Sequence, residues 1–215
     1  PFQAECIERI EAAGAICIGK ANLDAFAHGA STENSAYGPT TNPHDASRVA
    51  GGSSGGSAAS VALDIVPFAL GSDTGGSIRQ PASYCGVVGF KPSYGAVSRY
   101  GVVAMASSTD VIGPLTQSAG DAQLVMQVIA GVDEKDSTTT AVSYEETSKA
   151  GKKVGVIKEW LGDGVDEEVR QVVRRQIEKL TAKGYEVEEV SLPSLDYSLA
   201  VYYIIVPAEV ASNLA

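Results

Sequence analysis

The amino-acid sequence predicts an α/β fold, and three observations carry that prediction. Hydrophobic residues make up 44% and charged residues 20% of the 215 residues, which is the composition of a folded globular chain. Short apolar runs alternate with helix-like segments, several of which end at glycine. Near the C-terminus, a strand at Val154–Ile157, a helix capped by Asp166 and ending at Lys183 before Gly184, and a strand at Tyr185–Val190 follow one another. This order predicts that the two strands pair in parallel through a right-handed crossover.

The N-terminal part of the chain predicts a helix, a strand and a long loop. Residues 3–13 have the pattern of an amphipathic helix with three apolar side chains on one face, and Gly14 ends it. The apolar run Ala15–Ile18 predicts a short buried strand. A helical turn is expected at Asn22–Ala27. Residues 29–50 are polar and rich in turn formers, so they predict a surface loop.

The middle of the chain predicts a helix at Ser57–Ile65, a strand at Pro67–Leu70, a short helix at Ser77–Tyr84 and a strand at Val87–Phe90. Further on, Ser118 and Asp121 resemble a capping box ahead of a helix at Ala122–Ala130, which Gly131 closes. Residues 133–151 are polar and predict a loop. We therefore expect a mixed β-sheet core flanked by helices on both faces, within a single domain over residues 1–215 that is incomplete at both ends.

Composition excludes several classes of function. The formal net charge of −10 disfavours direct binding of nucleic acid, which requires clustered Lys and Arg. Three cysteines without a CxxC spacing and only two histidines argue against a structural metal site or a disulfide framework, so we expect no bound metal and a cytoplasmic location. The longest apolar run, Ala200–Ala208, is too short to span a bilayer, and no signal peptide is recognisable.

Two motifs come close to known catalytic patterns and fail. Residues 14–21 nearly form a phosphate-binding P-loop, but Ala21 has no hydroxyl for magnesium and the intervening residues favour a strand. Residues 52–56 fit G-x-S-x-G, but a nucleophile elbow needs a preceding strand and a histidine later in the chain. Both histidines, His28 and His44, precede it. An α/β-hydrolase is therefore a poor interpretation.

Two segments rich in glycine and serine, residues 51–57 and 71–79, are the strongest functional signal. A flexible linker is one interpretation, but apolar runs flank both segments. Glycine for close backbone packing is a second interpretation, which is compatible with catalysis. The third is a serine nucleophile beside a turn whose N–H groups converge on one point and form an oxyanion hole. Since neither histidine is a plausible base, the base must be a lysine, or a serine that relays a proton to lysine.

These two segments resemble the amidase signature family. Residues 51–58 and 71–82 match its serine motifs, and Ser53 and Ser77 lie 24 residues apart, as they do in that family. The resemblance implies a Ser–cis-Ser–Lys triad in which Ser77 is the acyl-forming nucleophile and Ser53 the bridging serine on a cis peptide bond. It also implies an oxyanion hole formed by the N–H groups of Thr74, Gly75, Gly76 and Ser77. We expect the hydroxyls of Ser53 and Ser77 to lie within hydrogen-bonding reach, about 3 Å.

Further segments narrow the resemblance to one branch of that family, the A subunits of glutamyl-tRNA(Gln) amidotransferases. Residues 29–35, 84–95 and 97–101 carry this likeness. The branch implies a glutaminase that works with B and C subunits, with tRNA held mainly by a partner. It implies that ATP and magnesium are used at the partner and that no cofactor binds this chain. Tyr202 would lie beside the bound glutamine.

One departure from the family pattern limits what this chain is expected to do alone. Neither Lys20 nor Lys91 matches the catalytic lysine motif of the family. We therefore expect a core fragment that is inactive by itself. The alternatives are a stand-alone amidase for small carboxamides and a catalytically incomplete fragment with a structural role.

Overall fold

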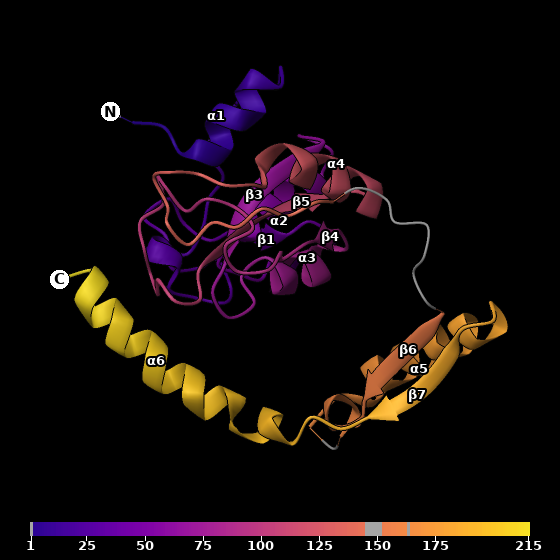
Figure 1. Ribbon diagram of the computed structural model, residues 1–215. Coiled ribbons are helices and arrows are strands. Elements are labelled where there is room, and N and C mark those ends of the chain that lie inside the picture. Colours follow the sequence, from indigo (N-terminus) through magenta and orange to yellow (C-terminus); the bar gives the residue numbers. More distant parts are fainter. Residues whose placement is uncertain (1, 145–151, 163) are drawn as a thin grey trace. The chain divides into compact units, whose positions relative to one another are not determined.

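The computed structural model describes residues 2–144, 152–162 and 164–215. Its internal contacts divide the chain into two units. The first comprises residues 1–145 together with 205–215, and the second comprises residues 146–204. The predicted α/β fold is confirmed, because helices and strands alternate in both units (Figure 1). No helix in the described ranges is long and apolar enough to cross a membrane.

The first unit is built around a three-stranded antiparallel sheet with the order β3-β5-β4. Its strands are β3 (Phe68–Asp73), β4 (Val88–Gly89) and β5 (Val111–Thr116), and its main helices are α1 (Glu5–Ala12), α2 (Gly55–Ala62), α3 (Arg79–Cys85) and α4 (Ala119–Ile129). The central strand β5 is buried along its whole length. The sheet therefore has helical cover on both sides, as Figure 1 shows for α3 and α4.

Two hydrophobic clusters lie on opposite faces of β5. Ile112 packs with residues of α1 and α4, among them Ile10 and Met126. Leu115 packs with residues of α2 and α3, among them Val61. Since successive side chains alternate across a strand, residues 112 and 115 point to opposite faces. The expectation of helices on both faces of the sheet is confirmed for this unit.

Most predicted helices of the first unit are confirmed with small shifts of their ends. The amphipathic helix before Gly14 is α1, with Cys6 and Ile10 buried. The Ser118 hydroxyl accepts a hydrogen bond from the N–H of Asp121 and so begins α4. The helical turn expected near residue 25 is a 3₁₀ turn, η1 (Ala25–Ala27).

Two predictions for the first unit were wrong, and one strand was missed. Ala15–Ile18 is not a strand, and Ile16 and Ile18 are 85% and 69% exposed, because no strand of the described chain pairs with this segment. The loop expected over 29–50 contains an antiparallel hairpin, β1 (Thr41–Asn42) and β2 (Asp45–Val49). Strand β5 was not predicted at all, since its sequence contains Gly113 and Pro114.

The second unit confirms the predicted strand–helix–strand pattern. Strands β6 (Lys153–Ile157) and β7 (Glu186–Val190) pair in parallel and are connected through α5 (Glu167–Ala182), whose first turn is capped by the Asp166 side chain. Three further elements are η2 (Lys158–Leu161), η3 (Pro193–Tyr197) and α6 (Ser198–Asn213), and α6 continues into the first unit. Of the loop expected over 133–151, residues 145–151 lie outside the described residues.

A substitution at Gly113 tests how closely the backbone packs around the central strand of the sheet. A Cβ atom at Gly113 would lie 2.1 Å from the Phe90 carbonyl oxygen and 2.9 Å from Pro92 Cδ. We expect Gly113→Ala to lower the free energy of unfolding by about 1–3 kcal/mol, because neighbouring backbone must move. The matched control is Gly120→Ala on α4, where a Cβ would meet only Ser118 Oγ at 3.7 Å. Urea denaturation of both variants checks this, and equal midpoints would contradict it.

Candidate active site

The first serine segment forms a tight buried turn between β2 and α2. Ser53 is 1% exposed and Ser54 is 5% exposed. The peptide bond between Gly52 and Ser53 is cis, as the family resemblance implies. Ser53 and its neighbours therefore lie inside the protein, where hydrogen bonds from neighbouring segments help to hold them.

The loop before the hairpin holds this turn from one side. The Thr32 hydroxyl donates to the Gly51 carbonyl at 2.8 Å and accepts from the Gly55 N–H at 3.0 Å. The N–H of Asp24 donates to the Ser53 carbonyl at 3.2 Å. Thr32 and Asp24 are fully buried. These bonds satisfy backbone groups on both sides of Ser53.

The Asp24 carboxylate organises that loop. It accepts hydrogen bonds from the N–H groups of Ser31 at 3.3 Å, Thr32 at 2.9 Å and Asn34 at 3.1 Å. A Cβ at Gly52 would lie 2.2 Å from Asp24 Oδ2. The absence of a side chain at Gly52 is therefore what lets the serine turn rest against this carboxylate.

The second serine segment is a turn between β3 and α3, and Asp73 holds its C-terminal half. The Asp73 carboxylate accepts from the N–H groups of Gly76 at 2.8 Å, Ile78 at 3.1 Å and Arg79 at 3.3 Å. The Arg79 guanidinium adds two further bonds at 3.0 Å. Burial alone would raise the pKa of Asp73, but the hydrogen bonds and charge of Arg79 and the backbone N–H bonds lower it overall.

The structure brings the two serine segments together. The N–H of Ser54 donates to the Ser77 carbonyl at 3.1 Å, and the N–H of Gly52 donates to Gln80 Oε1 at 2.9 Å. The Ser54 hydroxyl also bonds to the Ser72 carbonyl at 3.3 Å. The two motifs thus form one site although 24 residues separate Ser53 from Ser77.

The hydrogen bond expected between the hydroxyls of Ser53 and Ser77 is not formed. Ser53 Oγ is buried and has no hydrogen-bond partner in the described part of the chain. The bond that joins the two turns uses the Ser54 backbone, one residue beyond the hydroxyl that the prediction named. The site therefore presents a buried hydroxyl that lacks the partner such a group normally requires.

The structure leaves three of the four N–H groups that were predicted to form the oxyanion hole. The N–H of Gly76 is already bound to Asp73 Oδ1. The N–H groups of Thr74, Gly75 and Ser77 have no acceptor among the residues that the structure describes. These three groups remain as candidate donors to an anion, and their role stays a prediction.

The other residues singled out from the sequence do not complete the site in the described chain. Lys91 Nζ donates to the Pro92 carbonyl at 2.9 Å, and Lys20 is exposed. Within the same described ranges, neither lysine bonds to Ser53 Oγ. Tyr202 lies on α6 within the second unit, where its ring contacts that of Tyr203, and its proposed contact with substrate stays a prediction.

Sequence reasoning missed three residues that hold the site: Asp24, Thr32 and Gln80. Thr32 lies inside residues 29–35, which carried the family resemblance, but that resemblance did not indicate what Thr32 does. Gln80 likewise lies inside the matched residues 71–82. Asp24 lies outside every matched segment and acts through contacts with residues far from it in the chain, for which a single sequence offers no pattern.

Comparison with known proteins places the chain in a family. The family model described as Amidase matches residues 1–215. The A subunit of the glutamyl-tRNA(Gln) amidotransferase of Acaryochloris marina is 54% identical over 221 aligned residues, covering 100% of this chain and 46% of that protein. The corresponding A subunit of Heliobacterium modesticaldum is 55% identical, covering 100% of this chain and 45% of that protein.

Solved structures give the same result. The A subunit of the glutamyl-tRNA(Gln) amidotransferase of Thermotoga maritima has a TM-score of 0.93 and 49% identity, covering 99% of this chain and 48% of that chain. A peptide amidase bound to the competitive inhibitor chymostatin has a TM-score of 0.84 and 29% identity, covering 100% of this chain and 47% of that chain. The chain belongs to the amidase family, and it spans about half the length of the relatives it matches.

Asp73 gives the site a defined dependence on pH. Its pKa is lower in the folded protein, so its stabilising effect is complete above about pH 4, the ordinary range of an Asp carboxyl, and declines as pH falls further. We expect Asp73→Asn to cost about 1–3 kcal/mol at pH 7. The gap between wild type and variant should narrow as pH falls below about 4. Urea denaturation at pH 7 and pH 3 measures this, and a gap that widens in acid would contradict it.

Proposed function

We propose that this chain is the serine-bearing core of the glutaminase subunit of a glutamyl-tRNA(Gln) amidotransferase. The observation that carries the proposal is the hydrogen bond from Ser54 N–H to the Ser77 carbonyl, which joins the two serine turns beside backbone donors that have no acceptor in the described chain. The A subunits with which this chain shares 54% and 55% identity give the proposal its substrate class.

The geometry supports hydrolysis of the side-chain amide of glutamine. Ser77 Oγ attacks the amide carbon, and the N–H groups of Thr74, Gly75 and Ser77 stabilise the oxyanion that forms. Ser53 receives the Ser77 proton and relays it toward a lysine, as the family resemblance implies. The proton taken from Ser77 is delivered to the amide nitrogen as the C–N bond breaks, so that ammonia leaves, and water then releases glutamate from the acylated serine. The Ser53 hydroxyl, buried and without a partner among the described residues, is suited to this relay because it has a free position for the base.

The proposed amidotransferase function also predicts which subunits this chain works with. Ammonia passes to a B subunit, which amidates misacylated Glu-tRNA(Gln) with the use of ATP and magnesium, and a C subunit completes the complex. The tRNA is held mainly by the partner, in accord with the formal net charge of −10 on this chain. A cytoplasmic location follows from this role in protein synthesis.

A stand-alone amidase for small carboxamides is the second candidate. The likeness to a peptide amidase over the whole chain favours it. The two candidates differ in one measurable respect, because only the amidotransferase component forms a complex with a tRNA-binding B subunit. Co-purification with that subunit from cells that express both therefore separates them.

The serine assignment is tested by two substitutions in a protein of the relatives' full length that contains this chain. We expect Ser77→Ala to abolish ammonia release from glutamine, since no nucleophile remains. Ser53→Ala should lower kcat by about 10²–10⁴-fold, because the proton relay is cut. Ser60→Ala is the matched control, since its hydroxyl bonds to the Ser57 carbonyl within α2. Near-normal turnover by Ser77→Ala would refute the assignment.

The 215 residues alone should release no measurable ammonia from glutamine. The serine hydroxyl is a weak nucleophile without a base, and no lysine bonds to Ser53 Oγ in the described residues. The assay compares the purified chain with the full-length protein and with Ser77→Ala. Turnover near the full-length rate that disappears in Ser77→Ala would contradict the expectation and would direct mutagenesis to Lys20 and Lys91.

A further inference from the structure

The turn that carries Ser77 is held at its start by a second carboxylate, that of Asp110. Thr74 is the first residue after β3, and its hydroxyl donates to Asp110 Oδ1 at 2.6 Å. Within the described chain, the other contact of that hydroxyl is a long one to Met105 Sδ at 3.9 Å. The Thr74 side chain is thus fixed by one short hydrogen bond, while its own N–H has no acceptor in the described chain.

Asp110 is itself held in one orientation. It is 6% exposed, and its second oxygen, Oδ2, accepts from the N–H groups of Met105 at 2.9 Å and Ala106 at 3.0 Å. It directly precedes β5, and the β3–β5 ladder ends with Asp73 opposite Val111. Thr74 and Asp110 therefore face each other one step beyond a regular antiparallel pairing.

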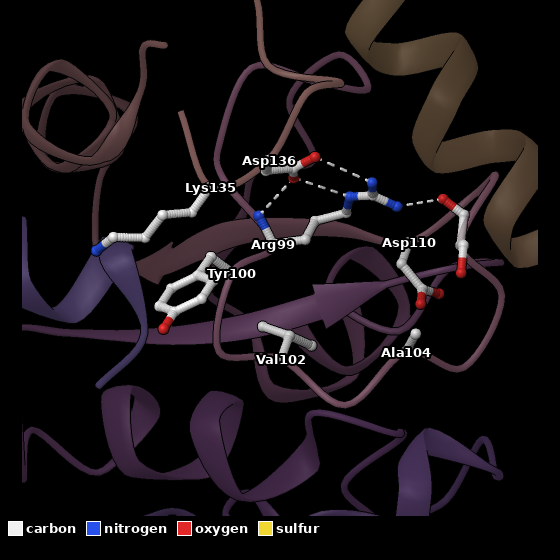
Figure 2. Close-up of a pocket in the computed structure, with 8 residues that line it drawn as sticks. Arg99, Tyr100, Val102, Ala104, Asp110, Lys135 and Asp136 are labelled. Atoms are coloured by element: carbon white, nitrogen blue, oxygen red, sulfur yellow. Dashed lines mark hydrogen bonds and ion pairs between the residues drawn. The ribbon is translucent and has the colours of Figure 1, made fainter. Parts of the chain in front are cut away.

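Asp110 forms no ion pair with the described residues. It lines a pocket of about 230 Å³ together with Arg99, Val102 and Ala104 (Figure 2). The Arg99 guanidinium is bound to Asp136, as the dashed lines in Figure 2 show, and also to the Ser107 carbonyl. Among the residues that the structure describes, the carboxylate of Asp110 bonds only to Thr74 and to the backbone of residues 105 and 106.

We propose that Asp110 is a positioning residue that, through the Thr74 hydroxyl, sets the backbone donors of the Ser77 turn. Asp73 holds the C-terminal half of the turn and Asp110 holds its first residue. The candidate donors are the N–H groups of Thr74, Gly75 and Ser77. Asp110 holds the side chain of Thr74, and Gly75 and Ser77 adjoin Gly76, whose N–H is held by Asp73. Donors fixed before reaction stabilise an oxyanion without reorganisation, which is the main source of their catalytic effect. This inference rests on the proposed role of the turn as an oxyanion hole.

The test uses the full-length protein and four variants. Thr74→Val removes the hydroxyl with little change of shape, Thr74→Ser restores it, and Asp110→Asn removes the charge. Thr109→Val is the control, since its hydroxyl lies in the same loop but bonds to the Ala106 carbonyl, at 3.3 Å. The measurements are kcat and KM for glutamine, binding of a boronate that forms a tetrahedral adduct with serine, and binding of glutamate. Circular dichroism establishes that each variant is folded.

We expect Thr74→Val and Asp110→Asn to lower kcat by about 10–100-fold with little change of KM, since loss of a complete oxyanion donor costs about 10²–10³-fold. Boronate binding should weaken in parallel and glutamate binding should not change. Thr74→Ser should recover most of the kcat that Thr74→Val loses, and Thr109→Val should behave as wild type. A purely structural contact would not separate boronate from glutamate in this way. Should Thr74→Val fail to fold, Thr74→Ala takes its place.

Two results would overturn the inference. One is a kcat for Thr74→Val within twofold of wild type while Ser77→Ala is inactive, which leaves the proposed function intact. The other is an active Ser77→Ala, which removes both, because the turn is then not the site. If the protein prefers another carboxamide to glutamine, the same variants are assayed on that amide, and the positioning role of Asp110 is decided independently of the substrate.

Discussion

The candidate site depends on backbone segments that approach more closely than any side chain permits. A Cβ at Gly51 would lie 2.8 Å from Pro81 Cα, and one at Gly55 would lie 2.3 Å from the Thr32 hydroxyl. Only a hydrogen atom fits at these positions, so the neighbouring segments can come close enough to form hydrogen bonds with the Ser53 turn. These bonds come from the preceding loop on one side and from α3 on the other. The same closeness lets the Ser54 N–H reach the Ser77 carbonyl, so that two turns become one site.

Sequence patterns predict the fold well where an element is stabilised locally. Helix α5 has its cap at Asp166, its amphipathic pattern and its stop at Gly184 within one stretch of chain, so its limits were predicted to within a residue. Strand β5 is the opposite case, because its place at the centre of the sheet comes from pairing with distant strands, and Gly113 and Pro114 hide it from propensity rules. The strand expected at Ala15–Ile18 failed for the same reason, since an apolar run becomes a strand only where a neighbour pairs with it.

The candidate site likewise contains some residues that the sequence predicts and others that only the structure reveals. Glycine and serine motifs single out Ser53 and Ser77 as candidates, because apolar runs flank both motifs and both match a known family. The residues that hold the turns, among them Thr32 and Asp110, carry ordinary side chains whose role comes from contacts across the fold. Sequence therefore locates the candidate reacting groups, while the structure is needed to identify what orients them.

Strand β5 supports two hydrophobic clusters at once, with Ile112 on one face and Leu115 on the other. Opening either face would displace the strand that both clusters share, so we expect the two clusters to open together. The first unit should thus open in a single cooperative step, and hydrogen exchange at the amides of this strand would proceed only through that step. The serine turn after β3 begins where the ladder with β5 ends, so we expect the turn to stay ordered for as long as that ladder does.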